Sequence, residues 1–344
     1  MDSIEASLGA RWQALRTDRP HLRTRDAAGE LGVSEVELVA TLDHATRLAP
    51  DPASLLHALP AVGRCMALTR NEHCVSEVRG TYGEVELGAH AGTVIGDAID
   101  LRVFLDHWRH LYAIDEPERR SIHVFDRTGT AVHKIYLEPS GDAAAWAAIV
   151  ASRAQPGPLV LEAAPPPRTE RPDAEIEREA LIAGWDAMTD THEFFHLLAK
   201  HGASRVQALR LAAEDETRPR ARRVSDGAIG EVLRGSAASG ERIMIFVGNR
   251  GCIQVFSGAV ARIAPHGPWL NVLDASFNLH LRADRIASSW VVAKPTRSGL
   301  VRSLELFDAA GETIALVFRR RDDRDLAEDP AWSAQLDALA GHAS

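Results

Sequence analysis

"GRCMALTRNEHCVSEVRG", residues 63–80, returns later in the chain as "ERIMIFVGNRGCIQVFSG", residues 241–258. A single offset of 178 positions aligns the two stretches over their whole length. Identical residues in the alignment include Arg64 with Arg242, Met66 with Met244, Cys74 with Cys252, and Gly80 with Gly258. Self-similarity between such distant segments indicates an internal duplication, which constrains the fold before any single element is considered.

The duplication extends beyond these stretches. "SIHVFDRTGTAVHKIY" (121–136) aligns with "SLELFDAAGETIALVF" (303–318), with a drift of a few residues that loop insertions would produce. Between the copies, "EAAPPPRTERPDAE" (162–175) holds three consecutive prolines among charged residues, which is typical of an extended linker. The sequence therefore predicts three parts: a first repeat at 1–161, a linker at 162–175 and a second repeat at 176–344.

Within each repeat, helical patterns come first and strand patterns follow. Apolar residues recur at three- and four-residue spacing in "ALIAGWDAMTDTHEFFHLLAKHG" (180–202), which predicts a helix ending at Gly202. Alternating and β-branched runs come next, and "FDAAGET" (307–313) between two of them predicts a hairpin turn. We therefore expect an α+β fold of two tandem homologous repeats, each with helices followed by a large antiparallel β-sheet.

The composition is that of a soluble globular protein, with 344 residues of which 45% are hydrophobic and 25% charged. A formal net charge of -9 argues against a mainly electrostatic grip on nucleic acid or anionic lipid. The N-terminus lacks the apolar core of a signal peptide, and the longest apolar run, "AAAWAAIVA" (143–151), is too short to span a bilayer. Three cysteines without a CxxC pair suit a reducing cytoplasm and exclude a cysteine-built metal site. These features predict a cytoplasmic protein with no nucleic-acid partner and no membrane insertion.

One short motif raises the question of zinc. "THEFFH" (191–196) contains His-Glu-x-x-His, and on a helix His192 and His196 would share a face. Both could then bind one zinc ion, with Glu193 as the general base of a hydrolase. The alternative is that both histidines are ordinary residues on a helix surface, with no role in metal binding.

A zinc site of this kind also needs a third protein ligand. The extended metzincin spacing would require glycine at 199 and histidine at 202, where the chain has Ala199 and Gly202. A downstream glutamate could serve instead, and Glu214 or Glu216 is available. Their segment, "AAEDETRPRAR", is polar and contains proline, which is typical of a loop.

Longer motifs favour a different function. "DTHEFFHLLAKHGASRVQALRL" (190–211), "NRGCIQVFSG" (249–258) and "GPWLNVLDASFNLHLRADRIASSWVVAKPTRSG" (267–299) resemble the HemS/ChuS family, also called hemin-degrading factors. These are cytoplasmic haem-handling proteins of bacterial haem uptake. The resemblance covers nearly the whole chain, including the duplication, and implies two tandem repeats of helices plus large antiparallel sheets.

The resemblance also implies a set of site residues. The first histidine of "DTHEFFH", His192, would be the axial iron ligand, whereas His196 would lie nearby without that role. "DLRVF" would supply a distal, catalytic Arg102 with Phe104 beside it. The remaining positions are cations on the propionate side and apolar walls of the pocket, namely Arg205, Lys294 and Arg321, and Met244, Phe246 and Phe318. The chain departs from the family at Phe256, where relatives commonly have histidine.

Elementary chemistry agrees with these roles. Haem iron needs one strong axial ligand, which neutral imidazole supplies, and its propionates need arginine or lysine partners. Met244 and Phe246 alternate onto one face of their strand and could form a flat apolar wall. Arg102 belongs to the first repeat and His192 to the second, so an Arg102 that reached the same iron would require haem between the repeats.

The implied function is haem utilisation, with haem b (iron protoporphyrin IX) as the cofactor. The chain would either degrade haem to release iron or pass it from an importer's cytoplasmic face to a haem oxygenase, and these possibilities share one site. The alternative from another class is the zinc-dependent hydrolase at 192–196. Relatives also suggest a second haem in the first repeat through His73, but the matching position is Gly251, which favours a structural or exposed histidine.

Overall fold

The computed structural model describes residues 7–166, 169–213, 220–320 and 330–341. The chain divides into two compact units. The first comprises Met1–Arg70, Glu77–Pro165 and Asn249–Gln254, and the second comprises Asn71–Ser76, Pro166–Gly248 and Val255–Ser344. None of the helices in the described ranges is long and apolar enough to cross a membrane.

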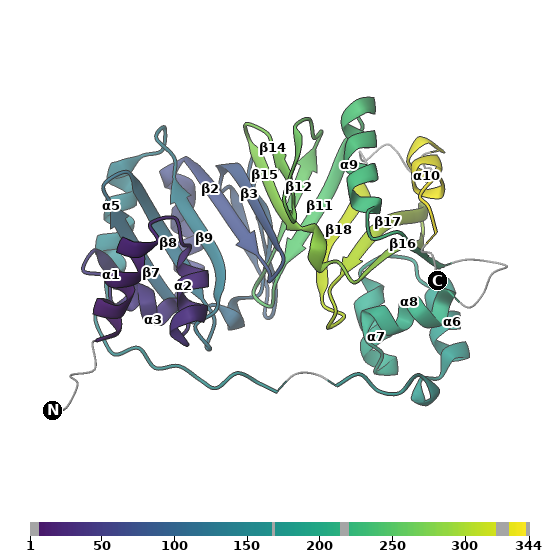
Figure 1. Ribbon diagram of the computed structural model, residues 1–344, viewed down its shortest axis with the longest axis horizontal. Helices are drawn as coiled ribbons and strands as arrows, with labels where there is room; N and C mark the ends of the chain where they lie inside the picture. Colours follow the sequence, from purple (N-terminus) through teal and green to yellow (C-terminus); the bar gives the residue numbers. More distant parts are fainter. Residues whose placement is uncertain (1–6, 167–168, 214–219, 321–329, 342–344) are drawn as a thin grey trace. The chain divides into compact units, whose positions relative to one another are not determined.

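Both units repeat one order of elements in their described residues: three helices, a strand, a helix, eight strands and a final helix (Figure 1). The first series is α1 (Leu8–Asp18), α2 (Thr24–Leu31), α3 (Glu35–Ala40), β1 (Ala45–Leu48), α4 (Pro52–Ala58), β2 (Arg64–Arg70), β3 (Cys74–Thr81), β4 (Glu84–Leu87), β5 (Gly92–Ile95), β6 (Asp100–Val103), β7 (His110–Glu116), β8 (Arg119–Phe125), β9 (Ala131–Leu137) and α5 (Ala143–Arg153). The second is α6 (Arg178–Asp186), α7 (Glu193–His201), α8 (Arg205–Ala213), β10 (Ala221–Val224), α9 (Ala228–Ser239), β11 (Ile243–Gly248), β12 (Cys252–Gly258), β13 (Ile263–His266), β14 (Trp269–Leu273), β15 (Phe277–Arg282), β16 (Ser288–Thr296), β17 (Gly299–Phe307), β18 (Thr313–Arg319) and α10 (Pro330–Asp337). The predicted α+β duplication is confirmed.

The strands of each unit follow the same topology. In the first unit the orders are β1-β7-β8-β9-β2-β3 and β6-β5-β4; in the second they are β10-β16-β17-β18-β11-β12 and β15-β14-β13. The paired strands run antiparallel, as in the hairpin of β17 and β18. Its turn contains Gly311 at φ 77, a left-handed conformation that glycine adopts without strain. The turn predicted at "FDAAGET" is thus present.

The division into units exchanges two short segments. Asn71–Ser76 belongs to the second unit although it lies in the first repeat, and Asn249–Gln254 belongs to the first unit. The two segments are related by the same offset of 178 that aligns the sequences. In each, the side-chain oxygen of the leading asparagine accepts backbone N–H bonds from the residues two and three positions later. The duplication is therefore preserved down to individual hydrogen bonds.

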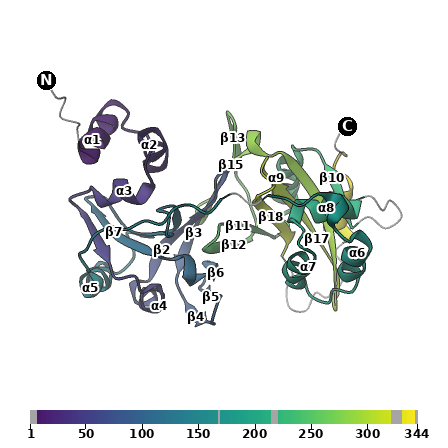
Figure 2. The same ribbon diagram turned by 90° about the horizontal axis from the view of Figure 1, so that it is seen from below.

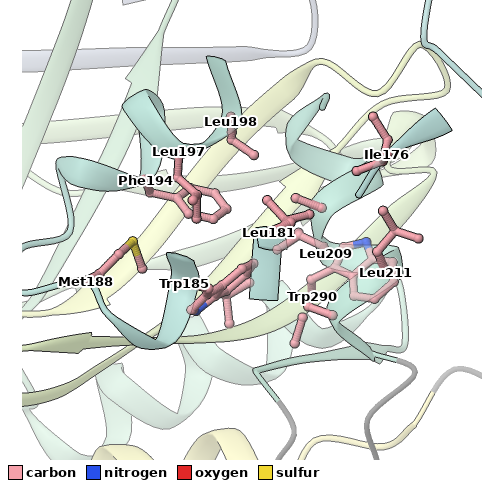
Figure 3. Packing of buried hydrophobic residues seen from close by; sticks show 14 of the residues in the cluster. Ile176, Leu181, Trp185, Met188, Phe194, Leu197, Leu198, Leu209, Leu211 and Trp290 are labelled. Atoms are coloured by element: carbon pink, nitrogen blue, oxygen red, sulfur yellow. The ribbon is translucent and has the colours of Figure 1, made fainter. Parts of the chain in front are cut away.

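Helices α6, α7 and α8 pack together against the sheet of the second unit (Figure 2). Figure 3 shows the apolar cluster that joins them, in which Trp185 of α6 meets Phe194 of α7 edge to face at 4.7 Å between ring centroids. Trp290 on β16 is buried in the same cluster. This packing fixes α7, which follows directly on His192, on the sheet.

The segment 180–202 differs from its prediction as one helix. It forms α6 and α7, separated by six residues, and His192 precedes the first residue of α7 instead of lying in a helix interior. Capping explains the break, because Glu193 accepts the backbone N–H of Thr189 at 2.8 Å and its hydroxyl at 2.9 Å. The predicted end is confirmed: Gly202, at φ 63, closes α7.

Candidate functional site

His192 is the N-cap residue of α7, at the end of the turn from α6. Its side chain is 86% exposed, and its Nδ1 lies 2.6 Å from Oδ1 of Asp190. A carboxylate can only accept a hydrogen bond, so this contact places a proton on Nδ1, and in the neutral imidazole Nε2 is then the nitrogen that holds the lone pair. The backbone N–H of His192 donates to the same oxygen at 2.8 Å, and these two bonds lower the pKa of Asp190. The imidazole is thus oriented as metal-binding histidines are, with an exposed acceptor nitrogen.

The other members of the His-Glu-x-x-His pattern have different surroundings. Glu193 is engaged by Thr189 in the helix cap, and these bonds lower its pKa. His196 is exposed on the first turns of α7. Within the described part of the chain, no three His, Cys, Asp or Glu side chains form a group that could hold a metal ion. Glu214 and Glu216, the sequence candidates for a third zinc ligand, lie outside the described residues.

A buried ionic cluster lies between α7, α8 and the sheet, and we call it the Glu305 cluster: Arg205 on α8, Lys294 on β16, and Ser303 and Glu305 on β17. The Glu305 side chain is 0% exposed. It accepts from Arg205 Nε at 2.7 Å and Nη2 at 2.9 Å, and from Lys294 Nζ at 2.6 Å. The Ser303 hydroxyl donates to it at 3.1 Å. Two cations therefore share one carboxylate in a nearly dry setting.

Burial and charge act in opposite directions within this cluster. Burial disfavours the charged form of Glu305, but Arg205 and Lys294 outweigh it and hold the pKa of that carboxyl well below its usual range. Burial lowers the pKa of Lys294 to about 8, against the opposing effect of Glu305. Phe194 covers both cations, with its ring centroid 4.6 Å from Lys294 Nζ and 5.1 Å from Arg205 Cζ. A buried carboxylate with charge-assisted bonds on both oxygens is a strong tether for α8.

Half-buried apolar side chains continue from the cluster on the same sheet face, and we call them the apolar strip: Met244, Phe246, Leu316 and Phe318. Met244 pairs in register with Phe318, and Phe246 with Leu316. Leu316 is in turn the register partner of Glu305. The rings of Phe246 and Phe318 meet edge to face at 5.2 Å. The predicted alternation of Met244 and Phe246 onto one face is confirmed.

Of the sequence candidates, the second unit thus holds His192, Arg205, Lys294 and the apolar strip. Arg102 and Phe104 belong to the first unit, where Arg102 pairs with Asp100 and the Phe104 side chain is half-buried. The backbone N–H of Phe104 donates to the carbonyl of Gly251. Arg321, the third predicted cation, lies outside the described residues.

Sequence reasoning missed Asp190 and Glu305. Asp190 could have been found, because aspartate just before a helical run is a common capping residue and a natural partner for the nearby imidazole. The sequence signal for Glu305 is its place in "SLELF" (303–307). Residues two apart on a strand share a face, so Glu305 lies on the same face as the apolar Phe307 and is expected to be buried with it.

Comparisons with known proteins agree on one family. The model described as the haemin-degrading HemS.ChuX domain matches residues 32–152 and 202–339. The chain belongs to the HemS family. It is 36% identical to the hemin transport protein HmuS of Yersinia pestis and 37% identical to HemS of Yersinia enterocolitica, in each case over 98% of both chains. Among solved structures, holo-PhuS, a heme-binding protein from Pseudomonas aeruginosa, is 44% identical with a TM-score of 0.92, covering 96% of this chain and 97% of that one. ChuS, an E. coli heme oxygenase, is 36% identical with a TM-score of 0.84, covering 96% of this chain and 98% of that one.

The two HemS-domain matches begin at Gly32 and Gly202, which end α2 and α7 in the same left-handed conformation. Counting back from these glycines places Leu22 at the position equivalent to His192. The same alignment pairs Glu35 on α3 with Arg205 on α8. The two units of this HemS-family chain therefore differ in the side chains that matter for a ligand site.

Proposed function

We propose that this chain binds haem through its second unit, with His192 as the axial ligand of the iron. The observation that carries the proposal is the state of His192, exposed and held by Asp190 through Nδ1, with Nε2 available to coordinate. Neutral imidazole is a strong axial ligand for haem iron, and such histidines usually donate their second nitrogen to a carboxylate or carbonyl. The similarity to PhuS, described as heme-binding in apo and holo forms, supports the same ligand class.

The surroundings of His192 suit the macrocycle and the propionates of haem. The apolar strip offers apolar contacts to the macrocycle, and a guanidinium on α8 offers a bidentate partner to a propionate. The roles we propose follow the family: Met244, Phe246 and Phe318 contact the ring, Arg205, Lys294 and Arg321 serve the propionate side, and Arg102 with Phe104 serves the distal side.

The ligand we propose is haem b, handled during haem utilisation. Its iron supplies the oxygen chemistry if the ring is opened, while the protein supplies ligation, apolar enclosure and positive charge. Relatives are described in two ways, HmuS and HemS as hemin transport proteins and ChuS as a heme oxygenase. Transport would involve an importer as donor and a haem oxygenase as acceptor. Turnover of bound haem with a physiological reductant and catalase separates these fates, because catalase removes the peroxide that destroys haem without an enzyme.

Titration with hemin, followed by the Soret band, tests the proposal. Wild type should bind one hemin per chain, His192→Ala should lose the Soret shift, and His196→Ala should bind like wild type. Equal loss in both variants would contradict a single axial ligand at 192. One equivalent of zinc in elemental analysis of the purified protein, lost in His196→Ala, would instead support the hydrolase alternative.

A further inference from the structure

Arg205 meets Glu305 along one edge only. Its hydrogen bonds use Nε and Nη2, and among the described residues its Nη1 makes none. Because a guanidinium is planar, a bidentate contact on one edge also fixes the direction of the remaining nitrogen. Arg205 Cζ lies 5.1 Å from the ring centroid of Phe194 and 5.7 Å from that of Phe195. Phe195 is 57% exposed and follows His192 by three residues, so the guanidinium reaches the open side of α7.

Lys294 has a different setting. Its side chain is only 3% exposed, and its ammonium lies against Glu305 and the face of Phe194. A carboxylate arriving from solvent would meet Arg205 first, since Arg205 is 13% exposed. Lys294 therefore also balances Glu305, which allows the carboxylate to remain charged while fully buried, and Arg205 is the more accessible of these two propionate-side cations.

We infer that Glu305 is a positioning residue for anion recognition: it orients Arg205 so that its outer N–H groups meet a carboxylate of the ligand bound at His192. The inference rests on the proposed haem function and deepens it, because it names a residue that acts on the propionates through Arg205. Glu305 does not touch the ligand. Its four donors saturate it from within the protein, and the cluster keeps one unit of positive charge for the incoming group.

The first unit provides a matched control. Glu35, 5% exposed on α3, pairs with Arg70 and with Lys134, the latter at 2.8 Å. This cluster has the same charges as the Glu305 cluster, and Glu35 occupies the position equivalent to Arg205. Its helix contributes the carboxylate, however, and its unit has Leu22 at the position of His192. Glu35→Gln and Glu305→Gln should therefore cost comparable stability, and only the second should change ligand binding.

The experiment compares hemin with its dimethyl ester, whose propionates are uncharged, in wild type, Glu305→Gln and Glu35→Gln. Glu305→Gln should weaken hemin binding about tenfold (about 1.4 kcal/mol) and leave ester binding unchanged. Its Soret maximum should stay at the wild-type position, because His192 still ligates. Glu35→Gln should bind both ligands like wild type. If Glu305→Gln does not fold, Glu305→Asp provides the same comparison, with the charge kept one methylene further from Arg205.

Two results would overturn the inference. Equal weakening of hemin and ester would show that Glu305 only stabilises the unit. Tighter hemin binding in Glu305→Gln would show that Glu305 competes with the propionate for Arg205 instead of orienting it. Failure of the haem proposal looks different, since wild type would then show no Soret shift that depends on His192.

Discussion

Replacing Asp190 with asparagine tests how the proposed iron ligand is prepared. Asparagine keeps nearly the same shape and can still accept from His192 Nδ1, but it removes the negative charge 2.6 Å from that nitrogen. Loss of such a partner behind a metal-bound histidine typically costs about 10- to 100-fold in affinity. The Asp190 side chain is 59% exposed, so water screens it, and we expect the lower end of this range. Hemin affinity should fall about tenfold, or by about 1.4 kcal/mol.

The assay is a hemin titration at fixed pH and salt, with Glu193→Gln as the control. Glu193 supports the same helix start through Thr189, whereas the His192 imidazole is paired with Asp190. Asp190→Asn should weaken hemin binding while Glu193→Gln leaves it within about twofold. Equal weakening in the two variants would attribute the loss to the helix start and refute the reasoning about the imidazole.

Two further predictions concern the first unit. Arg102→Ala should move the acid–alkaline transition of the ferric haem spectrum by roughly one pH unit, because a permanent cation on the distal side favours the more negatively charged, alkaline form. A transition that does not move, with unchanged ring-opening rates, would place Arg102 away from the iron. Burial lowers the pKa of His133 to about 3, and its ring is held between Thr69 and Tyr82. The folded state thus keeps His133 neutral while the unfolded chain binds a proton below pH 6.5, so His133 alone should lower the free energy of unfolding by about 1.4 kcal/mol per pH unit as pH drops from 6.5 towards 3. Burial also lowers the pKa of His123 well below its usual value, which adds to the slope in the same direction. Urea unfolding at pH 7 and pH 5 measures this slope, and a flat response would contradict it.

The fold was accessible from the sequence because the duplication repeats patterns that each have a physical meaning. Gly32 and Gly202 both take the left-handed conformation that ends a helix, so their alignment reflects one backbone requirement met twice. The exchange of Asn71–Ser76 with Asn249–Gln254 was not accessible. Either partner of a duplicated strand presents the same alternation, so the pattern does not reveal which copy a strand end joins.

The site was accessible only in part, for a related reason. Periodicity placed Met244 and Phe246 on one strand face, because alternation is a property of the strand alone. The placement of His192 before α7, and not within a helix, depends on side-chain bonds of Asp190 and Glu193 that compete with helix continuation. Charge partners are harder still to predict from the sequence, because Arg205 and Glu305 lie 100 residues apart and no local sequence pattern links them.

The two ionic clusters explain why equivalent surfaces need not bind the same ligand. A buried carboxylate with two cations leaves one unit of positive charge in either unit, so each unit has an ionic tether between a helix and its sheet. The two clusters differ in whether the helix or the sheet contributes the carboxylate. With Glu35 the helix contributes the acceptor and its cations lie on the strands, whereas with Arg205 the helix contributes a donor whose outer edge remains available. A ligand that carries carboxylates needs donor groups such as those of Arg205 on α8, next to the helix that His192 precedes. The first unit has Leu22 at the position of His192 and so lacks the matching imidazole. Duplication therefore preserved the tether in both units, and the reversal of its polarity, together with one histidine, is the reason we propose the haem site in the second unit and not in the first.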